Sequence, residues 1–148
     1  MDATRRASDF DLTRLAMARV SEAVSQGTTY VETKTGYGLD IEHEARSARI
    51  ASTVVDEVTY LGAHLVPAGT DAEAYTDLVC GPMLDAVRPY VRWADVFCEE
   101  GAFTAEQSRR VLEACRPRDW GSASTGTSSA RVRACSWRWY SGQPAWTT

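Results

Sequence analysis

Residues 28–55 decide the fold, and they read TTYVETKTGYGLDIEHEARSARIASTVV. Thr28 to Lys34 is rich in β-branched and aromatic residues, which favour a strand. Thr35-Gly36-Tyr37-Gly38 predicts a turn. Asp40 is a good helix cap, and apolar residues recur after it at spacings of three and four. The predicted inward positions of this helix are Ile41, Ala45, Ala48, Ala51 and Val55. A strand, a turn and a helix in succession indicate one β/α unit.

The same unit recurs further along the chain. Glu57 to Ala63 predicts a second strand, followed by a helical region from about residue 71 to 91 that Gly81-Pro82 should interrupt. Trp93 to Cys98 predicts a third strand, and the capping-box pattern Thr104 to Gln107 begins the next helix. Repeated β-then-α units predict parallel strands with right-handed crossovers.

A helix also precedes the first strand. Ser8 or Asp9 can cap it, and Gly27 suits its end. Its apolar positions recur at three and four: Leu12, Leu15, Ala16, Val20, Ala23 and Val24. At 148 residues the chain is shorter than a complete eight-unit barrel, which needs roughly 200 to 250 residues. The predicted fold class is therefore α/β, a partial (β/α) barrel arc of about three parallel units over residues 1–115, followed by an irregular tail over residues 116–148.

Composition excludes several classes of protein. No apolar run approaches the roughly 18 residues of a membrane span, and the N-terminus has no secretory apolar segment. The four cysteines form no C-x-x-C pair, so they predict reduced thiols in a cytoplasmic protein rather than a metal or disulfide framework. Residues 1–115 hold 19 acids and 11 bases, which argues against a nucleic-acid partner for the main body.

Chemistry in parallel sheets gathers at the carboxyl ends of the strands. That position predicts three candidates: Tyr37 between two glycines, His64 after the second strand, and Cys98-Glu99-Glu100 after the third. His64 could bond a substrate carbonyl or a metal, or could be satisfied by backbone groups. Tyr37 could contact a ligand or be an ordinary loop aromatic. The two glutamates could be catalytic or simply solvated, and His43 is interpreted as a surface histidine.

Three ordered motifs at these positions resemble the imidazolonepropionase family of amidohydrolases. They are residues 27–39 (GTTYVETKTGYGL), 60–67 (YLGAHLVP) and 94–99 (ADVFCE). The family pattern around the tyrosine resembles V-E-x-K-S-G-Y-G-L, with Thr35 in place of the serine. The resemblance covers roughly residues 4 to 115.

The resemblance implies a metal-dependent barrel that opens the imidazolone ring of 4-imidazolone-5-propanoate to give N-formimidoyl-L-glutamate. Tyr37 and His64 match the family residues that contact the substrate or product. The H-x-H metal pair would lie upstream of Met1, and the other metal ligands after Cys115, so no metal ligand is assigned here. The intact enzyme would use zinc or iron and could be a homo-oligomer, whereas this chain alone is expected to bind no metal and to be inactive. Two alternatives stay open, a non-catalytic remnant that binds an imidazole-like ligand and an amidohydrolase for another cyclic amide.

The composition changes after Cys115. Residues 116–148 contain no Leu, Ile, Phe or Met, and they hold four of the five tryptophans. Because tryptophan has a single codon, the possible DNA sequences of the tail are limited and can be translated in another reading frame. In the shifted frame the permitted codons can spell H-G-N-Q. This string resembles the next metal-binding motif of the family. We hypothesise a frameshift near Arg116. The alternatives are a natural flexible extension and, for residues 137–140 (WRWY), binding to single-stranded nucleic acid.

Overall fold

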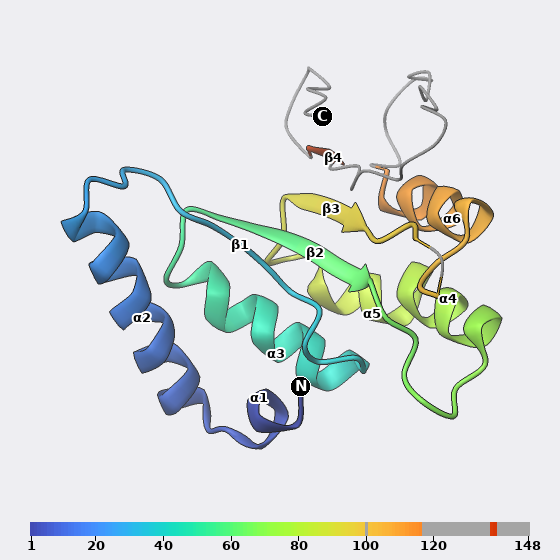
Figure 1. Ribbon diagram of the computed structural model, residues 1–148, viewed down its shortest axis with the longest axis horizontal. Coiled ribbons are helices and arrows are strands. Elements are labelled where there is room, and N and C mark those ends of the chain that lie inside the picture. Colours follow the sequence, from blue (N-terminus) through green and yellow to red (C-terminus); the bar gives the residue numbers. More distant parts are fainter. Residues whose placement is uncertain (100, 117–136, 139–148) are drawn as a thin grey trace.

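The computed structural model describes residues 1–99, 101–116 and 137–138. Helices and strands alternate along the chain (Figure 1). The elements are α1 Asp2–Arg6, α2 Asp9–Ser25, β1 Glu32–Lys34, α3 Ile41–Ser52, β2 Glu57–Ala63, α4 Ala72–Cys80, α5 Pro82–Val87, β3 Trp93–Val96, α6 Ala105–Cys115 and β4 Trp137–Arg138. The short helix α1 was not predicted from the sequence.

The sheet has the order β1-β2-β3-β4. β1 pairs with β2 in parallel, with Thr33 opposite Val58, and β2 pairs with β3 in parallel, with Tyr60 opposite Ala94. The prediction of parallel β/α units is therefore confirmed for three strands of an open sheet. β4 adds to β3 in the antiparallel sense, whereas the predicted tail contained no strand. An unpaired strand edge offers backbone hydrogen bonds to any extended segment, which allows this pairing.

Two strands are shorter than predicted, and for the same reason. β1 begins at Glu32 rather than Thr28 because its partner β2 begins at Glu57, directly opposite Glu32. β3 ends at Val96 rather than Cys98 because Val96 lies opposite Ala63, the last residue of β2. A strand needs a neighbour to bond with, so the length of β2 limits both of the strands beside it.

The predicted helix boundaries are confirmed where a local signal encodes them. Side chains of Ser8, Asp40 and Thr104 accept hydrogen bonds from backbone N–H groups three residues later and cap α2, α3 and α6. Thr104 forms the reciprocal capping box with Gln107. The predicted break at Gly81-Pro82 separates α4 from α5, with Pro82 at the first position of α5, where a missing N–H costs nothing.

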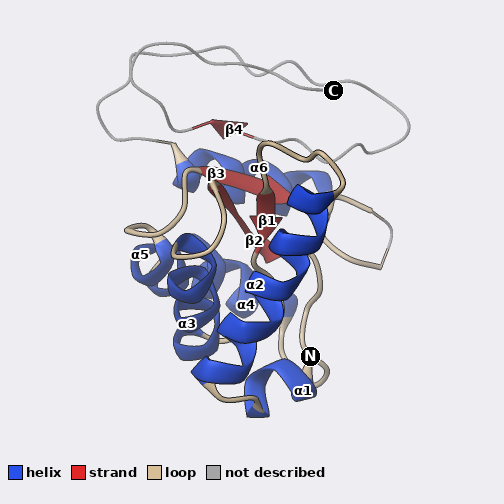
Figure 2. Ribbon diagram, turned by 90° about the vertical axis from the view of Figure 1, so that its left-hand side faces the viewer, coloured by secondary structure: helices blue, strands red, loops and turns tan. Residues whose placement is uncertain are grey.

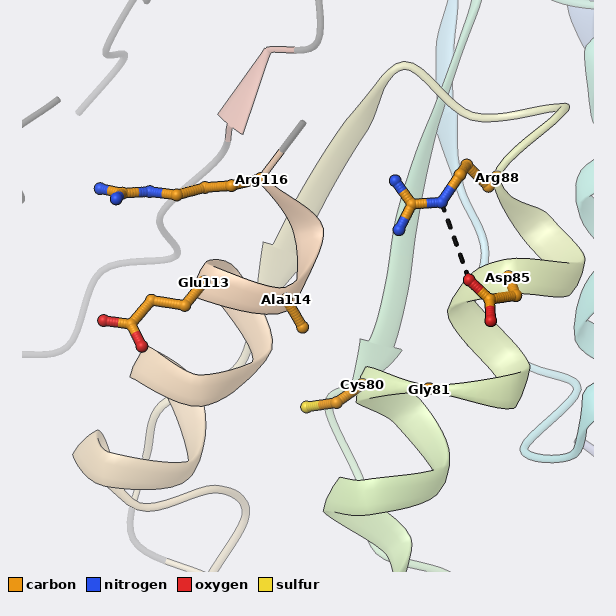
Figure 3. Close-up of a pocket in the computed structure, with 7 residues that line it drawn as sticks. All are labelled: Cys80, Gly81, Asp85, Arg88, Glu113, Ala114 and Arg116. Carbon is orange, nitrogen blue, oxygen red and sulfur yellow. Dashed lines mark ion pairs between the residues drawn. The ribbon is translucent and has the colours of Figure 1, made fainter. Parts of the chain in front are cut away.

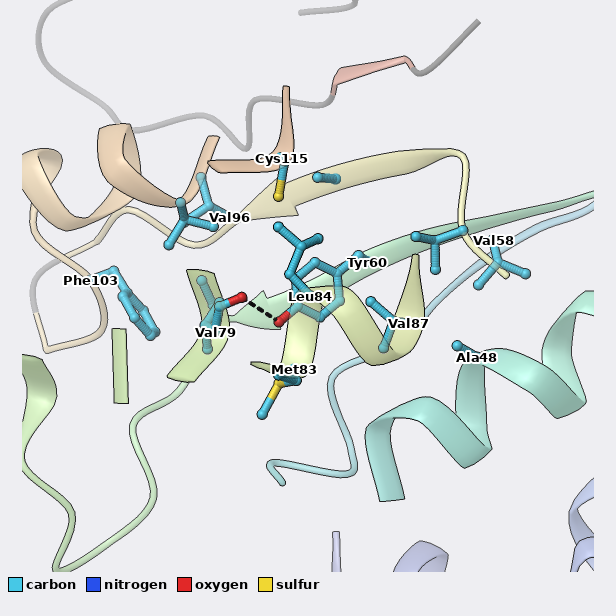
Figure 4. Close-up of a cluster of buried hydrophobic side chains, with 14 of the residues drawn as sticks. Ala48, Val58, Tyr60, Val79, Met83, Leu84, Val87, Val96, Phe103 and Cys115 are labelled. Atoms are coloured by element: carbon cyan, nitrogen blue, oxygen red, sulfur yellow. Dashed lines mark hydrogen bonds between the residues drawn. The ribbon is translucent and has the colours of Figure 1, made fainter. Parts of the chain in front are cut away.

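The hydrophobic core lies between the sheet and the helices that cover one of its faces (Figures 2 and 4). Strand residues such as Val58 and Val96 meet Leu84 and Val87 of α5 there. Tyr60 lies in the same cluster and donates its hydroxyl hydrogen to the Val79 carbonyl at 3.0 Å. Of the predicted inward positions of α3, Ala48 is fully buried.

Other apolar positions are more exposed than predicted. Ile41, in the first turn of α3, is 39% exposed. Helix α2 has no buried residue, because it lies outside α3 (Figure 1) and meets it through charged groups. Its Asp9 carboxylate accepts hydrogen bonds from Arg46 at 2.5 Å and Arg49 at 2.6 Å. No helix among the described residues is both long and apolar enough to cross a membrane.

Candidate functional site

The loop of residues 35–38, which follows β1, lies against the residues that end β2. Gly36 has a φ of +116°, and a Cβ atom built on it would lie 2.7 Å from the Leu61 carbonyl oxygen and 3.0 Å from Cε1 of His64. Only glycine fits so close an approach at this left-handed φ. The structure therefore brings the Tyr37 loop and His64 together, although they are 27 positions apart in the sequence.

Thr35 fixes the beginning of this loop to β2. It is 5% exposed, its N–H donates to the Thr59 carbonyl at 2.9 Å, and its hydroxyl oxygen accepts from the Leu61 N–H at 3.0 Å. The atom used is the hydroxyl oxygen, which serine also provides. The replacement of serine by threonine in the resembled motif therefore keeps this contact.

The end of the loop is fixed to α3. The Gly38 N–H donates to the Glu44 carboxylate at 2.8 Å. A Cβ atom on Gly38 would lie only 2.3 Å from the Glu44 backbone nitrogen, so no larger residue fits here. Between the two fixed ends, Tyr37 is 56% exposed and is available to a ligand.

The hydrogen bond of His64 determines which ring nitrogen is available. Nδ1 lies 3.1 Å from the Leu61 carbonyl oxygen, which can only accept. Nδ1 must therefore carry the hydrogen, so Nε2 of the neutral ring bears a lone pair. A backbone group therefore satisfies one ring nitrogen of His64, Nδ1, as one of the two interpretations expected. The other nitrogen, Nε2, makes no hydrogen bond to the described residues. Toward a ligand, neutral His64 is an acceptor at Nε2, and it becomes a donor there only when protonated.

Polar side chains that were not predicted as site residues occupy the strand positions that alternate with the core residues. Lys34 Nζ lies 2.5 Å from the carboxylate of Asp95, which is 2% exposed. Thr59 donates its hydroxyl hydrogen to Glu32, and the Trp93 indole donates to Glu57. Because successive strand residues face opposite sides, these groups lie on the sheet face away from the core. Alternation of polar and apolar residues in β2 was the available sequence signal.

Among the described residues, neither Cys98 nor Glu99 forms a side-chain hydrogen bond or ion pair with Tyr37 or His64. Glu99 is exposed, which agrees with the solvated interpretation, Cys98 is half-buried, and Glu100 lies outside the described residues. His43 is partly exposed on α3, and its Nδ1 lies 2.8 Å from an Asp40 carboxylate oxygen. His43 therefore supports the first turn of α3 rather than a ligand site.

A separate pocket of about 390 Å³ lies between the α4–α5 break and the end of α6 (Figure 3). It is lined by Cys80, Gly81, Asp85, Arg88, Glu113, Ala114 and Arg116. Arg88 lies 3.9 Å from Asp85, and the carboxylate of Glu113, which also lines the pocket, pairs with Arg109 at 2.7 Å. This pocket contains none of the strand-end residues, so the parallel-sheet argument does not place the chemistry there.

The described residues contain no group of three or more histidine, cysteine or acidic residues that could hold a metal ion. The frameshift hypothesis and the alternative interpretations of the tail concern residues that, apart from Arg116 and the backbone of residues 137–138, lie outside the described part of the chain.

Comparison with known proteins identifies relatives that share most of this chain. No protein-family model matches it. A protein named imidazolonepropionase from Arthrobacter sp. (strain FB24) is 79% identical over 119 residues, which cover 80% of this chain and 30% of the relative. Proteins of the same name from Paenarthrobacter aurescens and Saccharopolyspora erythraea are 77% and 59% identical, over 77% and 82% of this chain.

The chain spans about three-tenths of the length of these relatives. A match of 119 residues in a chain of 148 must include residues 37 to 64, so the Tyr37 loop and His64 lie within it. The described residues contain no cluster that could bind a metal ion. The matched segment nevertheless includes the loop after β1 and the histidine after β2 that were predicted as site residues from the sequence. Over the matched four-fifths of its length, the chain is homologous to part of these proteins named imidazolonepropionase.

Proposed function

We propose that the whole protein to which this segment belongs hydrolyses the C–N bond of the imidazolone ring of 4-imidazolone-5-propanoate in histidine degradation, giving N-formimidoyl-L-glutamate. The observation that carries the proposal is the 79% identity to a protein named imidazolonepropionase over a segment that includes Tyr37 and His64. Identity this high across buried strands, caps and loops leaves little room for a different local structure.

In this proposal Tyr37 and His64 contact the substrate. The neutral imidazolone ring carries one N–H donor and a carbonyl acceptor. Because Nδ1 of His64 donates to Leu61, its neutral ring suits an N–H of the substrate through Nε2. The protonated ring would instead donate to the carbonyl, whose negative charge rises during attack by water. The exposed Tyr37, on a loop that touches His64, can reach the same ligand.

The proposal extends to the architecture of the whole enzyme. Parallel sheets occur almost only where both faces are covered, and helices here cover one face while the other carries Lys34, Asp95 and Glu57. In a complete (β/α) barrel that polar face would be enclosed. Residues 1–115 would form an arc of this barrel, and residues 116–148 would not belong to it. We further propose a cytoplasmic enzyme that acts on a small molecule and could be a homo-oligomer.

A zinc or iron ion would supply an activated water in the whole enzyme. The residues described here do not fit that role alone, because they include no group of three ligands. We therefore propose that the 148-residue chain binds no metal and does not turn over the substrate. An alternative is a non-catalytic remnant which still binds an imidazole-like ligand.

The test is a titration of the 148-residue chain with imidazole-4-propanoate, followed by amide chemical shifts in NMR spectra. We expect shifts for the amides of residues 36–38 and 64, reduced in H64A and Y37A. The matched control is H43A, which removes a histidine held by Asp40 away from the site. Equal shifts in H64A and the parent chain would contradict the assignment, and ring opening by the pure chain would contradict its proposed inactivity. Preference for a different cyclic amide would support the other alternative.

A further inference from the structure

Glu44 is a charged residue in an unexpected place. The sequence places it directly after His43, which was interpreted as a surface histidine, yet the structure buries the Glu44 side chain completely. Glutamate is almost never fully buried unless its oxygens are paired. The burial of Glu44 therefore requires an explanation beyond the stability of α3.

The carboxylate has one partner, and that partner belongs to the Tyr37 loop. Oε2 accepts the Gly38 N–H at 2.8 Å, while Oε1 has no hydrogen-bond partner among the described residues. Burial, and then the nearby charge of Glu44, raise the pKa of Tyr75. The Tyr75 hydroxyl nevertheless donates to the Gly62 carbonyl, not to Glu44. The buried carboxylate thus has the loop N–H as its one hydrogen-bond partner among the described residues.

The loop is also packed against Glu44 sterically. A Cβ atom on Gly38 would lie 2.6 Å from the Glu44 Cα and 2.6 Å from Oε2. At its other end, Gly36 lies against the His64 ring. Tyr37 is held between these two contacts, so a displacement of Gly38 would move Tyr37 relative to His64.

We propose that Glu44 is a positioning residue for the substrate-contacting pair Tyr37 and His64: its buried carboxylate holds the Gly38 N–H and thereby sets the distance of Tyr37 from His64. Glu44 does not itself touch the ligand. The ligand-binding part of this inference rests on the proposed function, whereas the positioning of the loop does not.

Three variants separate the hydrogen bond from the packing. E44L keeps a side chain of similar volume but removes the acceptor. E44Q keeps an acceptor oxygen with nearly the same shape. E42L is the matched control, because Glu42 is an exposed residue of the same helix. Leucine is well tolerated in a buried position, so E44L is expected to fold.

The first measurement is hydrogen exchange of the Gly38 amide, without ligand, normalised to the Leu61 amide of β2. We expect exchange to accelerate about tenfold in E44L, the factor that one net hydrogen bond represents, and to stay close to the parent rate in E44Q and E42L. An unchanged rate in E44L, or equal acceleration in E44Q and E44L, would overturn the proposal.

The second measurement is the affinity of the same variants for imidazole-4-propanoate. We expect weakened binding in E44L and parent-like binding in E44Q and E42L. Parent-like affinity in E44L would overturn the link from Glu44 to the ligand site. Absence of binding by the parent chain would count against the proposed function of this segment, while the exchange experiment would still decide the positioning of the loop.

Discussion

Replacement of Asp40 tests the cap at the beginning of α3, which directly follows the Tyr37 loop. The Asp40 carboxylate caps α3 by accepting the His43 N–H at 2.8 Å, and it also pairs with Arg5 at 2.8 Å. Loss of the cap in D40A costs about 1 kcal/mol. Both members of the Arg5–Asp40 pair are more than a third exposed, so the pair contributes only about a few tenths of a kcal/mol to stability. We therefore expect D40A to lower the free energy of unfolding by roughly 1.5 kcal/mol in total. D40N keeps a capping oxygen, so its free energy of unfolding should fall by only about 0.5 kcal/mol.

The same residue gives a pH dependence of known sign. Burial tends to raise the pKa of Asp40, but the hydrogen bonds from His43 and the charge of Arg5 lower it on balance. A carboxyl group with a lowered pKa in the folded state stabilises the fold above about pH 4, and this stabilisation is lost as the pH falls through the folded pKa. Urea unfolding at pH 7 and at pH 3 measures both effects. The reasoning is refuted if D40N is as unstable as D40A at pH 7, or if the difference between D40A and the parent does not shrink at pH 3.

Other predictions concern the core, the loop and the thiols. Leu84 is 1% exposed in the core. Its replacement by alanine should lower the free energy of unfolding, measured in urea, by about 2–5 kcal/mol. G38A should be more destabilising than G69A, because a Cβ on Gly38 overlaps Glu44, whereas a Cβ on Gly69 meets no atom within 4 Å and adds only the strain of its φ of +80°. Equal losses would contradict this. Burial raises the pKa of Cys115 to about 12, so a thiol reagent at pH 8 should modify the half-buried Cys98 before Cys115, which should react only on unfolding.

Features encoded by neighbouring residues could be predicted from the sequence. Capping side chains and the Gly81-Pro82 break act within a few residues, and the structure places them as expected. The ends of β1 and β3 could not be predicted, because the length of β2 sets them through pairing. The exposure of α2 was missed because an apolar repeat indicates an inward face only if another element covers it.

The candidate site was predictable in part. Strand order placed Tyr37 and His64 at the same end of the sheet, and the structure confirms that their segments are adjacent through Gly36. The tautomer of His64 could not be predicted, because it depends on the Leu61 carbonyl in three dimensions. Glu44 was missed although a signal existed. It precedes the buried Ala48 by four positions, one helical turn, which places it on the inward face of α3.

The most direct test of the central claim is a chimera. The matched residues of this chain would replace the corresponding segment of the Arthrobacter protein, to which they are 79% identical. We predict that the chimera folds and opens the ring of 4-imidazolone-5-propanoate at a rate close to that of the Arthrobacter protein, and that His64→Ala within it lowers kcat/KM by at least about tenfold. A folded chimera without turnover, or one in which His64→Ala has no effect, would contradict the assignment of this segment as a working part of an imidazolonepropionase.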